Sequence, residues 1–239
     1  MHDMHMQTSR RGFLERLTVT TAATAAAAAA GLAALPSPVQ AMSRALGAPA
    51  AGGAERGDEW DTSWARRVNG KYRAVFDVPE IDSAYGVWRA SLWAKQYAEV
   101  LKAQPQEMTS AVVLRHNGIY LAMQQAYWDK YGTGAARKAT HPLTEQPTDR
   151  NPALLADLPE PFNQLSLDKY LARGGIALAC NLALQDVVAG IQEKEKVSPA
   201  EARKQALAWM VPGVILQPSG VFAALYAQDA AGCKYIRAS

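Results

Sequence analysis

The sequence predicts an α/β domain built on a five-stranded, mostly parallel β-sheet, and three observations support that prediction. First, short strand-like segments alternate with longer segments of helical periodicity over residues 70–239. Second, two strand-like segments, 110–116 and 176–180, are nearly continuous apolar runs, as expected for parallel strands covered on both faces. Third, glycine, proline or asparagine stands at several junctions between segments. Alternation of this kind is typical of strands joined by right-handed helical crossovers.

The five strand-like segments are short and rich in apolar or β-branched residues. The first ends at Pro79, and the fourth is followed by the turn Pro218-Ser219-Gly220. We expect each segment to form one strand of the same sheet. In chain order they cover residues 72–78, 110–116, 176–180, 213–217 and 234–237.

Between these segments, apolar residues recur at the three- and four-residue spacing of amphipathic helices. The helix before 176–180 should end at Gly174-Gly175, because glycine commonly follows a helix C-terminus. Ser198-Pro199-Ala200-Glu201 has the pattern of a capping box with proline at the first helical position, so it predicts a helix start. The predicted helices cover residues 81–102, 119–131, 163–172, 184–191, 199–210 and 221–231.

This order of elements predicts a flavodoxin-like three-layer sandwich, with helices on both faces of the sheet. In such sheets, ligands bind beyond the carboxyl ends of the strands. Residues 132–161 interrupt the pattern, because they are rich in Pro, Thr and Gly and have no clear period. A segment of this length is either a functional excursion or a mobile insert. We therefore expect residues 70–239 to form one domain with an insert at about 132–161.

The residues ahead of this domain have the pattern of an export signal. Arg10-Arg11 and an alanine-rich apolar segment at 17–35 are typical of a twin-arginine signal peptide, and small residues before Ala41 predict cleavage after Ala41. An uncleaved N-terminal anchor is the alternative. Residues 42–69 lack periodic apolar positions and are expected to form a flexible leader. The expected location is the periplasm, reached in folded form through the twin-arginine translocase.

Composition and motifs exclude several classes of partner. The net charge of +3 is small, and no basic run alternates with aromatic residues, so nucleic-acid binding is not expected. The spacing of His, Cys, Asp and Glu indicates no metal site. No cofactor is expected either. The segment Val78-Pro79-Glu80-Ile81-Asp82 is acidic where a flavin mononucleotide phosphate loop needs Ser, Thr and Gly, and the sequence lacks the glycine motifs of nucleotide-binding loops.

Cys180 is the strongest candidate for chemistry, because it ends a buried strand directly before a helix. A thiol at a helix N-terminus faces free backbone N–H groups and the positive end of the helix dipole, which together favour the thiolate. A reactive role requires solvent to reach this thiol. The alternative is a small, inert core residue. Cys233 is expected at the opposite end of the sheet, away from Cys180, as core filler or a surface residue.

Other polar residues follow the predicted strands at the same edge of the sheet. His116 could assist the thiolate or polarise a ligand, or it could be a satisfied strand-end histidine. Four further residues could contact a ligand, although all of them also suit helix capping. These are Asn117, Asn181, Ser219 and Gly220.

Three segments of the domain resemble the DsrE/DsrF-like sulfur-relay family. Residues 174–184 are similar to its strand–Cys–helix segment, and residues 112–119 to its second strand. Residues 214–221 and 232–236 resemble its closing pattern V-P-S-G-V … G-Y-x-Y-I. The resemblance implies a flavodoxin-like fold, trimers or hexamers, and a cysteine that carries sulfur as a persulfide. By position, that cysteine is Cys180.

These observations lead to a functional expectation with two alternatives. The leading expectation is a periplasmic, homo-oligomeric sulfur carrier that uses Cys180 and exchanges sulfur with a donor or acceptor protein, without turnover of its own. The first alternative is a non-catalytic, oligomeric binding or assembly module exported in folded form. The second is an enzyme acting on a small molecule through His116 and Ser219.

Overall fold

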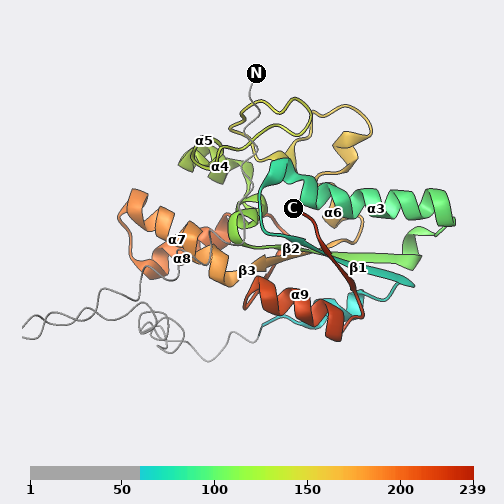
Figure 1. Cartoon of the computed structure of the whole chain (residues 1–239). Helices are drawn as coiled ribbons and strands as arrows, with labels where there is room; N and C mark the ends of the chain where they lie inside the picture. The colour runs from blue at the N-terminus through green and yellow to red at the C-terminus, as the bar shows by residue number, and fades with distance from the viewer. Residues whose placement is uncertain (1–59) are drawn as a thin grey trace, which may run out of the picture. The chain divides into compact units, whose positions relative to one another are not determined.

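The computed structural model describes residues 60–239, and a five-stranded sheet forms the centre of this part of the chain (Figure 1). The strand order is β4-β3-β2-β1-β5, and every neighbouring pair is parallel. The predicted α/β, flavodoxin-like fold is confirmed, and the described sheet is parallel throughout. The strands are β1 (Tyr72–Val78), β2 (Met108–Leu114), β3 (Ile176–Cys180), β4 (Ile215–Gln217) and β5 (Lys234–Arg237).

Helices cover both faces of the sheet, so the domain has three layers. The α-helices are α3 (Tyr85–Leu101), α4 (Gln125–Tyr131), α5 (Thr133–Arg137), α6 (Leu167–Ala172), α7 (Asn181–Glu195), α8 (Pro199–Ala208) and α9 (Gly220–Asp229). The larger core lies between the sheet and α3, α4, α6, α7 and α8. The smaller core lies on the other face, under α9 and the 3-10 helix η1 (Ser63–Arg67). Figure 1 shows α3 and α9 on opposite sides of the strands.

The alternation of side chains along the strands explains why two cores form. In β1, Ala74, Phe76 and Val78 pack in the larger core, whereas Val75 packs in the smaller one. In β3, Ile176 and Leu178 face α9. Because both faces are covered, these strands need apolar residues at consecutive positions, which accounts for the nearly continuous apolar runs in the sequence.

Several predicted boundaries need correction. The strand predicted at 110–116 ends at Leu114, because His116 has φ +46° and takes the chain out of the sheet. The helix predicted at 119–131 is a 3-10 helix, η4 (His116–Ala122), followed by α4. The helix predicted at 163–172 begins only at Leu167, after a short 3-10 turn.

The segment 132–161 is attached to the domain by a buried asparagine. Asn151 is fully buried, and its Nδ2 donates to the carbonyl oxygens of Leu121 at 3.1 Å and Met123 at 2.7 Å. Its Oδ1 accepts from the backbone N–H of Ala153 at 2.9 Å. The segment also contains α5, which the sequence pattern did not reveal.

The predicted leader at 42–69 extends too far toward the C-terminus. Residues 60–69 belong to the fold, because Trp64 in η1 is fully buried and its ring contacts that of Tyr226 in α9 with 5.7 Å between centroids. Trp64 therefore packs with residues of α9 in the smaller core. The predicted signal peptide, its cleavage after Ala41 and the remainder of the leader lie outside the described residues. Within residues 60–239, no helix combines the length and apolar character needed to cross a membrane.

At one place in the sheet, the helices that follow two neighbouring strands pack on opposite faces. The neighbouring strands β3 and β4 are followed by α7 on one face and α9 on the other. In an open parallel sheet, a crevice forms at the carboxyl ends of such a pair, and ligands bind there. Cys180 ends β3 and Gln217 ends β4, so both residues lie at this switch point.

Candidate functional site

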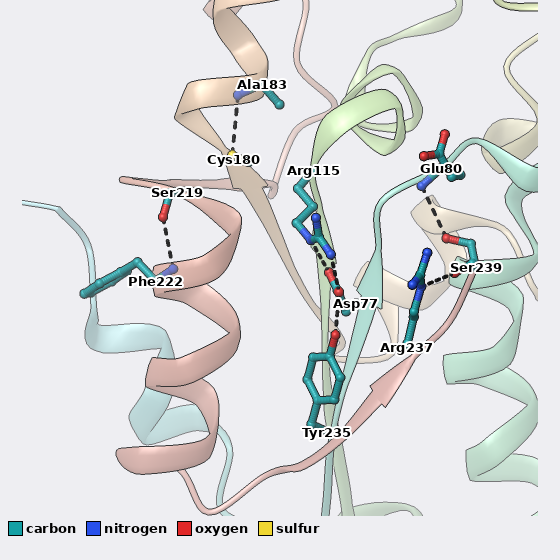
Figure 2. Close-up of polar contacts among 10 residues, drawn as sticks. All are labelled: Asp77, Glu80, Arg115, Cys180, Ala183, Ser219, Phe222, Tyr235, Arg237 and Ser239. Atoms are coloured by element: carbon teal, nitrogen blue, oxygen red, sulfur yellow. Dashed lines mark hydrogen bonds and ion pairs between the residues drawn. The ribbon is translucent and has the colours of Figure 1, made fainter. Parts of the chain in front are cut away.

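Cys180 lies at the junction of β3 and α7, as the sequence predicts. It is the N-cap residue of α7, and its Sγ accepts a hydrogen bond from the backbone N–H of Ala183 at 3.4 Å (Figure 2). The thiol is therefore directed at the first turn of a 15-residue helix, where it caps one of the backbone amides that the helix leaves without an internal partner.

Solvent has little access to this thiol, although a reactive role requires solvent to reach it. Cys180 is only 6% exposed and belongs to the same apolar cluster as Ala179 and Ala183. The hydrogen bond to Ala183 explains the burial, because it turns the sulfur back onto the helix rather than outward.

Gln217 was missed by the sequence analysis and lies beside Cys180. The two residues are register partners on neighbouring strands, which places their backbones about 4.8 Å apart. Gln217 is fully buried, and its Nε2 donates to the carbonyl oxygens of Asp61 at 2.8 Å and Leu216 at 2.9 Å. Its Oε1 has no hydrogen-bond partner within residues 60–239. A buried acceptor without a donor is thus adjacent to the thiol-bearing residue. Only its position, last in a strand and just before Pro218, could have indicated it.

Asn181 and Ser219 both have structural partners at the switch point. The Oδ1 of Asn181 accepts from Arg203 Nη1 at 2.9 Å, which ties the start of α7 to α8. The Oγ of Ser219 accepts from the backbone N–H of Phe222 at 3.0 Å and caps α9 (Figure 2). The capping role considered for Ser219 is therefore present.

Gly220 allows Arg115, the residue that follows β2, to lie close to α9. A Cβ atom at position 220 would lie 2.7 Å from both Cβ and Cδ of Arg115. The aliphatic part of Arg115 therefore occupies the space that a side chain would fill, and Gly220 lines a protein contact rather than an open ligand site.

Arg115 also belongs to an ionic cluster around the buried carboxylate of Asp77, which was not predicted from the sequence. Its Nε and Nη2 donate to the two carboxylate oxygens of Asp77 at 2.6 and 2.7 Å, and the hydroxyl of Tyr235 donates to the same carboxylate at 2.6 Å (Figure 2). The carboxylate of Asp77 is 2% exposed. A single carboxylate within the apolar strand 72–78 was the signal that could have revealed this cluster.

The charge state of Asp77 follows from competing effects. Burial acts to raise the pKa of this carboxyl, but the hydrogen bonds from Arg115 and Tyr235 and the charges of Arg115 and Arg237 together lower it. The pair stays ionised, and its two hydrogen bonds hold Arg115 in place just after the end of β2.

His116 and Asn117 line a different, polar cleft of about 460 Å³. Asn117 is held by its neighbours, since its Nδ2 donates to Glu80 at 2.9 Å and its Oδ1 accepts from Arg137 at 3.4 Å. Cys180 and Ser219 are not among the residues lining this cleft. Within the described chain, no hydrogen bond links His116 to Cys180 or to Ser219, whose side chains accept from the backbone N–H groups of Ala183 and Phe222.

Cys233 lies just before β5 at the amino end of the sheet, as expected, and neither cysteine forms a disulfide. It is a core residue with 6% exposure. Desolvation raises the pKa of its thiol to about 11, although the nearby charge of Arg73 acts in the opposite direction. Across residues 60–239, no group of three His, Cys, Asp or Glu side chains is arranged to hold a metal ion.

Comparison with known proteins gives no relative from which a function could be transferred. No family model matches the sequence, and no curated protein or solved structure matches it either. We therefore infer the function from the residues of this chain alone.

Proposed function

We propose that this protein is a DsrE/DsrF-like sulfur carrier in which Cys180 holds a sulfur atom as a persulfide. The observation that carries the proposal is the hydrogen bond from the Ala183 amide to Cys180 Sγ at the start of α7. Amide donors at a helix N-terminus stabilise negative sulfur, and both a thiolate and a persulfide anion are negative. In this role the protein stores and transfers sulfur without turnover of its own.

The loading step needs a donor that already contains a sulfur–sulfur bond. The Cys180 thiolate attacks the terminal sulfur of a hydropolysulfide ion or a donor protein's persulfide. A new S–S bond forms on Cys180 as the donor's S–S bond breaks, and the electron pair leaves with the shortened polysulfide or the donor's thiolate. The number of electrons and protons is unchanged, so no separate oxidant is needed.

The burial of Cys180 limits which donors can deliver sulfur. With 6% of the residue exposed, a thin polysulfide chain fits the proposal better than a bulky disulfide. Gln217, the register partner of Cys180 on β4, adds a buried acceptor without a donor to this end of the sheet.

Mass spectrometry of polysulfide-treated protein tests the proposal, with the two cysteines as matched sites. The Cys233→Ala variant should gain about 32 Da per added sulfur, mapped to Cys180. The Cys180→Ala variant, which retains the equally buried Cys233, should gain nothing under native conditions. Equal labelling of both variants, or no labelling of Cys233→Ala, contradicts the proposal.

A homo-oligomeric assembly module is the second candidate, and the outer face of α9 favours it. Val221 and Leu225 are more than half exposed, and Phe222 and Tyr226 on the same helix are partly exposed and stacked at 5.4 Å. A helix that is apolar on all sides is usually covered on all sides. A second copy of this chain would supply that cover, and a trimer or hexamer is the assembly that the family resemblance implies.

Light scattering coupled to gel filtration tests the assembly. The Val221→Glu/Leu225→Glu double variant should run as a monomer while the wild-type protein runs as an oligomer. Leu207→Glu is the matched control, because Leu207 is also exposed but lies on α8. Identical masses for all three proteins would remove α9 as the interface.

We also propose that the protein is exported in folded form to the periplasm. The support is Arg10-Arg11 ahead of an apolar segment. Replacing both arginines with lysine should leave the chain in the cytoplasm at full length, whereas wild-type protein should appear in the periplasmic fraction without residues 1–41. Periplasmic delivery of the lysine variant would contradict this route.

A further inference from the structure

A second cleft lies along α3, away from Cys180. Its volume is about 900 Å³, and it runs between α3, the amino ends of β2 and β3, and the segment 161–175. Pockets for small organic ligands have volumes of roughly 300–1,000 Å³, so the cleft is large enough for one such molecule.

A group of aromatic residues forms part of the wall of this cleft. Tyr85, Trp88, Trp93 and Phe162 line it, with ring centroids 5.6 Å apart for Tyr85–Trp88 and 5.7 Å apart for Trp88–Phe162. Trp88 is 5% exposed, and its Nε1 has no hydrogen-bond partner in the described part of the chain. A buried indole N–H normally finds an acceptor, so this wall contains an unused donor.

The charged residues lining the cleft all carry the same sign. They are Arg89, Lys95 and Arg173, and the lining contains no Asp or Glu. Arg89 and Lys95 have acidic neighbours outside the lining, Asp82 at 3.6 Å and Glu99 at 3.8 Å respectively.

Arg173 differs from the other two cations. It donates to the carbonyl oxygen of Gln164 at 2.8 Å and to Ser91 Oγ at 2.9 Å, both of which are uncharged. No carboxylate within residues 60–239 forms a salt bridge with it. A guanidinium has five N–H donors, so Arg173 has donors left for a planar anion.

We propose that this cleft binds a small organic anion with an apolar body, whose carboxylate pairs with Arg173 while the body lies against Trp88 and Phe162. The aromatic residues of the cleft suit the apolar body of the ligand. The three cations, with no acidic residue in the lining, suit its anionic head. Trp88, which also lines the cleft, has an unpartnered Nε1 that provides a second donor. Because Cys180 is not among the lining residues, this site is independent of sulfur transfer and can fail or succeed separately.

Calorimetry with decanoate and decanol tests the proposal, because the two probes share an apolar chain and differ in the charged head. The wild-type chain should bind decanoate at least about tenfold more tightly than decanol, since a charge-assisted hydrogen bond contributes that much. Arg173→Gln should abolish this preference while retaining weak binding of both probes. Arg150→Gln is the control, because Arg150 pairs with Asp157 outside the cleft.

A second variant tests the position of the apolar body. Phe162 lines the cleft and its ring lies beside Trp88, so Phe162→Ala should remove part of the apolar wall and weaken binding of both probes. The proposal is overturned if neither probe binds the wild-type protein, if decanoate has no advantage over decanol, or if Arg173→Gln or Phe162→Ala binds both as the wild-type protein does.

Discussion

The two ends of the sheet each contain a buried cysteine, and the two cysteines differ in what surrounds the sulfur. Cys180 and Cys233 are both 6% exposed and both unpaired. The sulfur of Cys180 receives an amide hydrogen bond from Ala183. No hydrogen bond in the described residues reaches the sulfur of Cys233, and desolvation raises the pKa of that thiol to about 11. Equal burial therefore does not imply equal chemistry, because the carboxyl end of a parallel sheet is followed by helix N-termini that supply donors.

The same contrast extends to the other polar groups of the two ends. The carboxyl half of the sheet holds the charged cluster of Asp77, Arg115 and Tyr235. The amino half holds a neutral pair, in which the hydroxyl of Tyr170 donates to the carbonyl oxygen of Ser110 at 2.7 Å. The buried carboxylate of Asp77 thus lies toward the end of the sheet where α/β proteins bind ligands.

Removing the charge of Asp77 should have the largest effect on stability. Asp77→Asn leaves the part-buried Arg115 without its counter-ion, and breaking a buried pair in this way costs about 3–5 kcal/mol. Urea unfolding at neutral pH measures the loss. Asp157→Asn is the matched control, since its pair with Arg150 is exposed, and it should leave the midpoint nearly unchanged. Similar midpoints for the two variants would show that the cluster does not stabilise the carboxyl end.

A methyl group at Gly220 should have the next largest effect. Its Cβ would lie 2.7 Å from Arg115, whose position is fixed by Asp77, so Gly220→Ala should cost about 1–3 kcal/mol. Gly190 in α7 provides the opposite case, because nothing lies within 4 Å of a Cβ built there. Gly190→Ala should stabilise the protein by about 0.4–1 kcal/mol. Thermal unfolding of both variants checks the sign, and a stable Gly220→Ala protein would mean that Arg115 can move aside.

Local patterns predicted much of this fold, and tertiary packing determined the rest. The alternation of apolar runs gave β1 and β3 with correct boundaries, since burial on both faces leaves a direct signature in composition. The predicted end of β2 was wrong, because the positive φ of His116 arises where η4 packs against the end of β1. Gly118 there donates its N–H to the carbonyl of Pro79 at 3.0 Å.

The candidate site was predictable only in part, for a related reason. Strand–helix order placed Cys180 and Ser219 at helix starts, which is local information. The burial of the sulfur, the position of Gln217 beside it and the Asp77–Arg115 pair depend on strand order and register. Those contacts join residues far apart in the chain, so a local pattern can mark one residue of a contact but not its partner.

Serine and alanine substitutions should rank in opposite order at the two cysteines. At position 180, serine retains an acceptor for the Ala183 amide, so Cys180→Ala should be less stable than Cys180→Ser by about 1 kcal/mol. At position 233, a buried hydroxyl has no partner waiting for it, so Cys233→Ser should be less stable than Cys233→Ala by at least about 1 kcal/mol. Urea midpoints of the four variants test this, and the same ranking at both positions would remove the distinction between the two ends of the sheet.

The remaining expected effect is a dependence of stability on alkaline pH that Cys233 alone contributes. Its pKa in the folded protein is about 11, above the ordinary value of 9.0, so the unfolded chain loses this proton first. The thiol's contribution is therefore fully present below pH 9 and is lost as the pH rises to about 11. The difference in unfolding free energy between wild-type protein and Cys233→Ala should shrink across that range, because groups common to both proteins cancel in the difference. A constant difference would mean that the Cys233 thiol is less desolvated than its burial implies, and the contrast with Cys180 would then rest on the Ala183 hydrogen bond alone.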